Sequence, residues 1–340
     1  MIEHKPELRY NLMTGDWVVV SPDRGRRPHP HAQMPPTNLG PAFVQTCPFC
    51  AGNEAETLAE TARVEGPTAW FARAVENRFP ALAPTGELER DGEGYERSMT
   101  GIGRHEVIVE SPHHNTMMAL LPVDRVRDVL TLYRERTRAI YADSRVEHVI
   151  VFKNHGEAAG STLDHPHSQI VGTPVVPGQV RVRIEEALRQ YGQLGECLYC
   201  YCMRQEIAGE VRIVEETPTF VALIPYAALS PFHIWIVPKR HCAYFGGATD
   251  DELTALAGIL QRTLRRLDLA LGNPHFNYVI RSLSPPEEGV KYYHWYLSIV
   301  VRLTRSAGFE LGTGMYINTA LPEESARRLR EVALDEAPLG

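Results

Sequence analysis

The first half of the chain contains, in order, Cys47-Pro48-Phe49-Cys50, His105-Glu106-Val107-Ile108-Val109, His113-His114 and His165-Pro166-His167. The second half repeats this order with Cys197-Leu198-Tyr199-Cys200, His233-Ile234-Trp235-Ile236-Val237, His241 and His294-Trp295-Tyr296. The spacings agree, because His114 and His165 are 51 residues apart and His241 and His294 are 53 apart. A duplication of this kind predicts two copies of one structural unit, here residues 1–176 and 177–340.

Two long amphipathic stretches occupy corresponding places in the halves. In the second half Thr249 and Glu252 form a capping box, and the apolar face that follows comprises Leu253, Leu256, Ala257, Leu260, Leu264 and Leu267. In the first half the corresponding face comprises Val126, Val129, Leu130, Tyr133, Thr137, Ile140 and Tyr141.

Alternating or β-branched runs predict strands at residues 17–20, 148–152, 219–224, 277–281 and 294–301. The Gly- and Glu-rich stretch 83–103 is expected to be a surface loop. Each half is therefore expected to be an antiparallel sheet carrying a helix, which makes the fold class α+β.

The composition excludes several classes of protein. Across 340 residues, 35 basic and 42 acidic side chains give a formal net charge of −7, which disfavours a nucleic-acid partner. No run reaches the roughly 18 apolar residues of a membrane span, and the first residues lack the apolar core of a secretory signal. We expect a soluble, cytoplasmic protein without a membrane partner.

Four of the six cysteines form two C-x-x-C pairs, a spacing typical of metal or redox chemistry. Zinc prefers four thiolate or imidazole ligands, and each half offers such a set in the same order. The predicted ligands are Cys47, Cys50, His114 and His165 in one half and Cys197, Cys200, His241 and His294 in the other. Redox dithiols or buried cysteines are the alternative, His113 competes with His114, and Cys202 competes with Cys200.

The segment 154–169 is the densest in chemically useful residues. Gly156 and Gly160 allow backbone amides to approach an anion, while Asn154, Ser161 and Thr162 offer side-chain donors, which suits a phosphate. If residues 165–169 are extended, His165, His167 and Gln169 project from one face.

With these residues the chain resembles the galactose-1-phosphate uridylyltransferases of the histidine triad superfamily. The resemblance rests on Leu8-Arg9-Tyr10-Asn11, on the segment 21–28, on Cys47-Pro48-Phe49-Cys50, on Glu76-Asn77-Arg78-Phe79-Pro80 and on His165-Pro166-His167-Ser168-Gln169. It implies two tandem histidine-triad-like repeats that form one extended mixed sheet.

The resemblance also implies the roles of individual residues. It makes His167 the nucleophile, Gln169 a ligand of the transferred phosphoryl group and His114 the metal ligand. It places Arg24 and Arg27 near the substrate phosphates and Phe49, Asn77 and Phe79 around the nucleoside. The alternatives are a structural histidine for His167, solvated loops for the arginines and a loop anchored by a core aromatic for Asn77 and Phe79.

The implied reaction transfers UMP from UDP-glucose to galactose 1-phosphate. A neutral imidazole attacks the α-phosphorus, and a second phosphate resolves the phosphoramidate that forms. The implied partners are a nucleoside diphosphate sugar and a sugar 1-phosphate. We also expect about two zinc ions per chain. The resemblance implies a homodimer in which residues 310–318 close the neighbour's site.

The second half departs from this pattern. The stretch 308–318 and the second C-x-x-C resemble the ADP-glucose phosphorylase branch more, so phosphorolysis of ADP-glucose is an alternative function. Tyr316 is a candidate sugar contact, with core packing as the alternative. A non-catalytic zinc or nucleotide-binding protein is a further alternative from another class.

Overall fold

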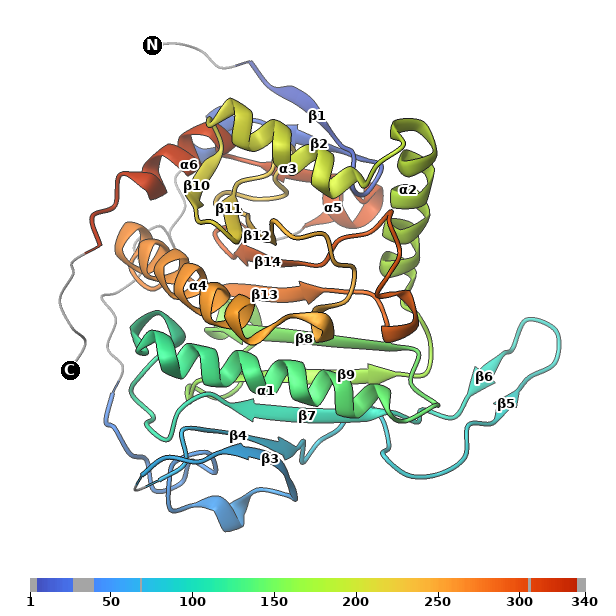
Figure 1. Cartoon of the computed structure of the whole chain (residues 1–340), viewed down its shortest axis with the longest axis vertical. Helices are drawn as coiled ribbons and strands as arrows, with labels where there is room; N and C mark the ends of the chain where they lie inside the picture. The colour runs from blue at the N-terminus through green and yellow to red at the C-terminus, as the bar shows by residue number, and fades with distance from the viewer. Residues whose placement is uncertain (1–4, 27–39, 68, 305–306, 335–340) are drawn as a thin grey trace.

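The computed structural model describes residues 5–26, 40–67, 69–304 and 307–334, and its main feature is a ten-stranded sheet (Figure 1). The strand order is β10 (Ile213–Glu216), β11 (Phe220–Leu223), β12 (Ile234–Pro238), β14 (Tyr296–Val301), β13 (Phe276–Arg281), β8 (His148–His155), β9 (His167–Thr173), β7 (Arg104–Val109), β4 (Ala72–Glu76) and β3 (Glu60–Val64). The α+β class is confirmed.

The two repeats arrange their strands in matching order on either side of the centre of the sheet. Starting between β8 and β13, one side runs β8, β9, β7, β4, β3 and the other runs β13, β14, β12, β11, β10, so corresponding strands of the two repeats hold corresponding places. Every pair in this sheet is antiparallel, so the expected mixed sheet is wrong in that detail. The boundary at residue 176 stays a prediction.

A three-stranded sheet of β1 (Glu7–Asn11), β2 (Asp16–Val20) and β15 (Tyr316–Asn318) lies beside the second half. Its β2–β15 pair is parallel, with Tyr316 opposite Val18. Strands from near the beginning and near the end of the described chain therefore pair in one small sheet.

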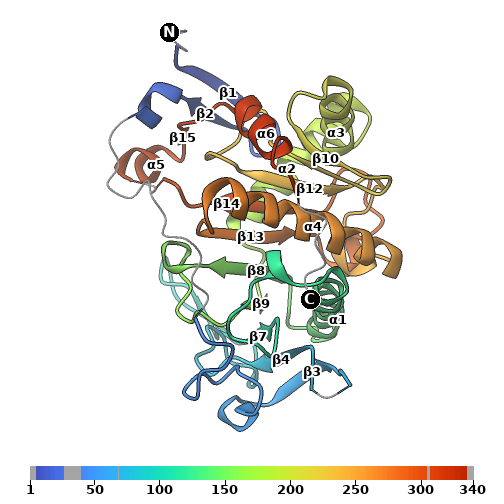
Figure 2. The same ribbon diagram turned by 90° about the vertical axis from the view of Figure 1, so that its left-hand side faces the viewer.

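Helices α1 (Val123–Tyr141) and α4 (Asp250–Leu271) cover one face of the large sheet side by side (Figure 2). The predicted apolar faces point inward, and residues such as Val129, Leu130, Leu256 and Leu260 are fully buried in the main core. Close packing reaches the backbone of β9, where a Cβ on Gly172 would lie 2.5 Å from Ile140 Cγ2. Glycine is required there because α1 leaves no room for a side chain.

The opposite face of the second half carries two helices that the sequence did not predict, α2 (Gly178–Leu194) and α3 (Leu198–Gly209). They cover a second core that includes Tyr199, Trp235 and Tyr296. The expectation of one helix per half is wrong here, because Cys197-Leu198-Tyr199-Cys200 resembles a metal-binding turn and hides the start of α3.

Short elements complete the fold. The predicted loop 83–103 contains a small hairpin of β5 (Arg90–Asp91) and β6 (Ser98–Met99) that projects from the body (Figure 1). Helices α5 (Gly308–Thr313) and α6 (Pro322–Arg330) flank β15. Within the described ranges, no helix combines the length and the apolar character needed to cross a bilayer.

The capping box of α4 gives a stability test. Glu252 N–H donates to Thr249 Oγ1 at 3.2 Å, and Thr249 N–H donates to the Glu252 carboxylate at 2.9 Å. Thr249→Ala should therefore lower the free energy of unfolding by about 1 kcal/mol in a urea titration. Thr254→Ala is the matched control: this hydroxyl only bonds the Asp250 carbonyl on the exposed side of α4, so no loss is expected.

Candidate functional site

Strand β9 places the predicted catalytic residues on one face of the sheet. Side chains alternate along a strand, so His167 and Gln169 point away from α1 whereas Ser168 and Ile170 point toward it. Gln169 stands opposite Phe152 of β8, and Asn154, two residues further along β8, shares that face. The sheet thus brings His167, Gln169 and Asn154 to one surface.

The His167 ring is held in one tautomer. Its Nδ1 lies 2.8 Å from the carbonyl oxygen of His165, which can only accept, so Nδ1 carries the proton and Nε2 keeps its lone pair. Phe49 packs against the ring, with centroids 5.6 Å apart. Burial lowers the pKa of His167, and the nearby Lys153 ammonium adds to this, so the imidazole is neutral at pH 7.

His105, which the sequence analysis did not assign to the site, orients Gln169. The Ala81 N–H donates to His105 Nδ1 at 3.0 Å, so the proton of the neutral ring lies on Nε2. Nε2 then donates to Gln169 Oε1 at 2.8 Å, which leaves the Gln169 amide NH2 as a donor. The Asn77 NH2 group, 3.0 Å from the same nitrogen, then makes no hydrogen bond to it, because a protonated ring nitrogen cannot accept. The only sequence signal for His105 was its place at the start of a repeated strand.

The predicted phosphate loop follows β8 directly. Gly156 and Gly160 have φ of +80° and +86°, and the Ser161 N–H donates to the Gly156 carbonyl at 3.2 Å. A Cβ on Gly160 would lie 3.9 Å from Asn154 Nδ2, so the amide of Asn154 faces the loop. Ser161 Oγ bonds the Leu163 carbonyl, and Thr162 is exposed.

The four residues of the first predicted metal set converge. Cys47 Sγ lies 3.6 Å from His165 Nδ1, and Cys50 Sγ lies 3.6 Å from His114 Nδ1. A tetrahedral zinc centre with bonds of about 2.3 Å to sulfur and about 2.05 Å to nitrogen separates these atoms by about 3.6 Å. His113 is exposed and outside this cluster, so the geometry selects His114.

The second set converges in the same manner. Cys200 Sγ lies 3.3 Å from His241 Nδ1 and 3.4 Å from His294 Nδ1, and Cys197 completes the group. Cys202 is not a member. Unlike the first pair, Cys197 and Cys200 stand at the N-terminal end of α3.

Backbone carbonyls orient three histidines of the two clusters, namely His165, His241 and His294. His165 Nε2 donates to the Ser111 carbonyl and His294 Nε2 to the Pro238 carbonyl, both at 2.8 Å. His241 Nε2 donates to the Val290 carbonyl at 2.9 Å. With the proton held on Nε2, each Nδ1 presents a lone pair toward the thiolates, as a metal ligand must.

Among the residues that the structure describes, the second half has no counterpart of His167. Tyr296 occupies the place of His167, is buried, and packs against Trp235 with centroids 4.8 Å apart. Ser298 occupies the place of Gln169 and bonds His233 Nε2 at 2.9 Å. Aromatic packing under α2 and α3 thus fills the second copy of the site.

A buried polar network lies directly behind His167. Lys153 Nζ donates to the His167 carbonyl at 2.9 Å and to Glu110 Oε2 at 2.7 Å. Glu110 also accepts from the Ser168 hydroxyl, and Tyr133 contacts that hydroxyl as well. These residues hold β9 from its helix-covered face, and sequence analysis did not assign them to the site.

Comparison with known proteins agrees with this geometry. Residues 1–177 match the model of the galactose-1-phosphate uridyl transferase N-terminal domain. The chain belongs to the galactose-1-phosphate uridylyltransferase family. It is 36% identical over 334 residues to ADP-glucose phosphorylase of Arabidopsis thaliana, covering 97% of this chain and 93% of that protein. It is 30% identical to galactose-1-phosphate uridylyltransferase of Thermotoga maritima, covering 97% and 99%.

Solved structures give the same relationship. The Arabidopsis thaliana ADP-glucose phosphorylase with bound ADP-glucose superposes with a TM-score of 0.83 at 32% identity, covering 98% of this chain and all of that one. A uridylyltransferase superposes with a TM-score of 0.73 at 28% identity, covering 95% and 97%. The family consists of transferases and phosphorylases, so this chain is an enzyme of the nucleotidyltransferase type.

Other residues that the family resemblance singled out lie elsewhere. Arg24 is exposed in the turn after β2, next to the end of β15, and Tyr316 pairs with Val18 in the same small sheet. Phe79 is 85% exposed, so the core-anchor alternative is wrong for it. Asn77 lies near the site, with Nδ2 3.0 Å from His105 Nε2. Arg27 lies outside the described residues.

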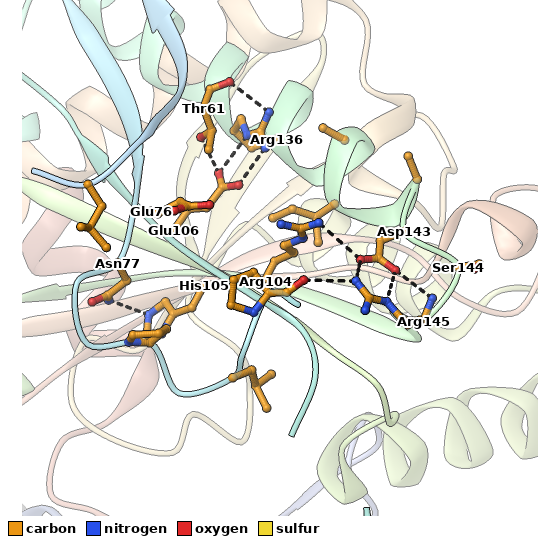
Figure 3. A pocket seen from close by; sticks show the side chains of 17 residues that line it. Thr61, Glu76, Asn77, Arg104, His105, Glu106, Arg136, Asp143, Ser144 and Arg145 are labelled. Atoms are coloured by element: carbon orange, nitrogen blue, oxygen red, sulfur yellow. Dashed lines mark hydrogen bonds and ion pairs between the residues drawn. The ribbon is translucent and has the colours of Figure 1, made fainter. Parts of the chain in front are cut away.

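A pocket of about 810 Å³ lies mainly on the other face of the sheet, beneath α1 (Figure 3). It shares Asn77 and His105 with the candidate site, but His167 and Gln169 do not line it. Its arginines are paired: Arg136 with Glu106 at 2.7 Å, and Arg145 and Arg104 with Asp143 at 2.6 and 3.6 Å. The arginines of this pocket are therefore engaged with carboxylates that also line it.

The buried Lys153–Glu110 pair predicts a large effect on stability. Lys153→Met leaves the Glu110 carboxylate buried without its cation, so the free energy of unfolding should fall by about 3–5 kcal/mol. Lys153→Met combined with Glu110→Leu removes both charges and should lose less. Lys239→Met, which breaks the exposed pair with Glu216, should cost no more than about 1 kcal/mol. Equal losses for the buried and exposed pairs in chemical denaturation would contradict this prediction.

Proposed function

We propose that the protein transfers a nucleotide from a nucleoside diphosphate sugar to a phosphate acceptor through a covalent nucleotidyl-histidine on His167. The observation that carries the proposal is the tautomer of His167. Its Nδ1–H is donated to the His165 carbonyl, and the lone pair on Nε2 is free for attack.

In the first step, Nε2 attacks the α-phosphorus, an N–P bond forms, and the bond from phosphorus to the bridging oxygen of the β-phosphate breaks. The sugar 1-phosphate leaves with the electron pair of that bond. In the second step an acceptor phosphate oxygen attacks the same phosphorus and the N–P bond breaks. The His165 carbonyl stabilises the positive charge on the ring in the intermediate.

Fixed donors around His167 support this assignment. Gln169 presents its NH2 group because His105 occupies its oxygen, and Asn154 faces the glycine loop. Preorganised donors of this kind stabilise negative charge that develops on phosphoryl oxygens. Gln169 is the residue we assign to the transferred phosphoryl group, with Asn154 and Thr162 on the neighbouring phosphate. The Gly160 and Ser161 N–H groups and the Ser161 hydroxyl already donate to carbonyls of the loop, so these two residues shape the loop.

The comparisons support ADP-glucose as the nucleotide donor and inorganic phosphate as the acceptor. Of the two relatives compared by sequence, the phosphorylase is the more similar, at 36% against 30% identity. Transfer of UMP from UDP-glucose to galactose 1-phosphate is the second candidate, favoured by the match of residues 1–177 to the uridyl transferase domain.

We assign zinc to both Cys2His2 clusters. A bound ion in the first cluster would fix His165, whose carbonyl holds the tautomer of the nucleophile. The second cluster would join α3 to the strand ends that carry His241 and His294. In both places zinc would serve as a structural ion.

We further propose a homodimer. Tyr316 belongs to the small sheet, Arg24 lies in the turn that follows β2 of that sheet, and Leu311 of α5 is 82% exposed. The segment 310–318 thus offers exposed side chains suited to closing the site of a second subunit.

The covalent intermediate can be detected directly. Incubation with ADP-glucose alone should add one AMP to the protein, on His167, and incubation with UDP-glucose alone should add UMP more slowly. The adduct should be acid-labile and alkali-stable, and peptide mass spectrometry locates it. His167→Ala should abolish the adduct and lower kcat by at least about 10³-fold.

His113→Ala is the matched control, because this exposed histidine lies outside the metal cluster and should leave adduct formation unchanged. If His167→Ala turned over at near the wild-type rate, the nucleophile would be misassigned. Faster labelling by UDP-glucose would favour the second candidate.

Metal content and stability form a further test. Elemental analysis should find about two zinc ions per chain, and Cys47→Ser or Cys200→Ser should each remove about one. Structural zinc contributes about 10 kcal/mol or more to small domains, so both variants should melt at clearly lower temperature. Cys202→Ser is the matched control and should retain both ions. A wild-type chain with one ion or none would refute at least one site.

A further inference from the structure

The orientation of the Asn154 amide depends on the second half of the chain. Asn154 stands directly opposite Asn277 of β13, so the two side chains share the face of His167. Asn277 Nδ2 donates to Asn154 Oδ1 at 2.8 Å. This bond occupies the oxygen of Asn154 and leaves its Nδ2, which faces Gly160, as the group available to a ligand.

Asn277 is itself held in one orientation from two sides. Its Nδ2 also donates to the carbonyl of Ala159, within the phosphate loop, at 2.8 Å. Its Oδ1 accepts from Arg302 Nε at 2.5 Å. Because a guanidinium can only donate, it fixes which end of the Asn277 amide is oxygen.

Arg302 is in turn anchored by its backbone. It follows β14 directly, and its N–H donates to the His275 carbonyl at 2.8 Å. The same histidine, through Nδ1, accepts from the Ala158 N–H at 2.8 Å. One segment of the second half, residues 275–277, therefore contacts the phosphate loop of the first, and Arg302 holds that segment from behind.

We propose that Arg302 and Asn277 form an orienting relay that makes Asn154 a hydrogen-bond donor to a substrate phosphate. Both are positioning residues, since they act on the substrate through Asn154. Without the relay, the Asn154 amide can rotate by a half-turn and present its oxygen to a phosphate, which repels it. The inference rests on the proposed function and identifies what the second half adds to the first-half site.

The relay has a parallel on the other side of His167. There the Ala81 N–H donates to His105 Nδ1, and His105 Nε2 donates to the oxygen of Gln169, which leaves the NH2 group of Gln169 for a ligand. The side-chain amides of Gln169 and Asn154 are thus oriented in the same way. In each, a donor from a neighbouring segment bonds the amide oxygen, and the amide NH2 group is left for the anion. Only the relay through Arg302 and Asn277 comes from the second repeat.

A double-mutant cycle tests the relay. Asn277→Leu removes both amide bonds without adding charge, and Asn154→Ala removes the group on which it acts. Calorimetry measures the affinity for ADP and, separately, for UDP. Steady-state kinetics measure kcat/KM with ADP-glucose and with UDP-glucose. Asn277→Leu should lower affinity and kcat/KM about tenfold or more in the wild-type background, the effect of one hydrogen bond to a charged group. In the Asn154→Ala background the further loss should be less than about threefold.

Arg302 is tested by rescue. Arg302→Lys keeps a donor-only group and should stay within about threefold of the wild type, whereas Arg302→Met should approach Asn277→Leu. Arg327→Met, which removes an exposed arginine paired with Glu331 on α6, is the matched control and should change neither measurement. Melting temperatures of all variants should lie close to that of the wild type.

Equal losses in the two backgrounds would overturn the relay, since a structural or long-range electrostatic role does not depend on Asn154. Wild-type affinity in Asn277→Leu, or no binding of either nucleotide to the wild type, would overturn it too. Failure of the proposed function is a separate result, namely a wild-type chain that binds nucleotide but forms no adduct on His167, and the binding cycle still decides the relay in that case.

Discussion

The alternation of side chains along β9 is the constraint on which the site depends. His167 and Gln169 reach the open face only because Ser168, between them, is fixed on the helix-covered face by Glu110 and Tyr133. A slip of one residue in register would exchange the two sets and place the nucleophile in the core. The buried Lys153–Glu110 pair makes such a slip costly, because Lys153 bonds both the carboxylate and the His167 carbonyl.

The chemistry of the site depends on which hydrogen-bond acceptors surround the imidazole rings of His165 and His167. The carbonyls of Ser111 and His165 take the protons of His165 and His167, which leaves Nδ1 of one ring for a metal and Nε2 of the other for the substrate. The two histidines of this motif therefore present different ring nitrogens to their ligands. The difference arises because a backbone oxygen bonds Nε2 of His165 but Nδ1 of His167. The chemistry assigned to His167 thus requires little flexibility, since the tautomer is set before a substrate arrives.

Much of this arrangement could be predicted from the sequence, because it repeats. The ligand sets, the two long helices and the α+β class follow from patterns that occur twice, and the capping box of α4 is a local signal. What remained hidden depends on contacts between distant segments: Lys153 meets Glu110, and Asn277 meets Asn154, only through strand pairing. Helix α3 was missed because much of its packing face is made of cysteine, tyrosine and methionine rather than a regular aliphatic stripe. Helix α2 was missed because its buried apolar residues are only Val180 and Ala187, too few for a clear helical pattern.

The two repeats separate the Cys2His2 cluster from the histidine that follows it in the first half. Both halves keep two cysteines, two histidines and the carbonyl partners of the ligand rings, yet only the first keeps a histidine two residues after its ligand. In the second, Tyr296 and Trp235 fill that place beneath α2 and α3. A metal ion bound to a cluster without a neighbouring reactive histidine would hold the turn, the strand end and the helix together. The same role in the first half suffices to explain why the cluster stands next to His167, whose position it fixes through His165.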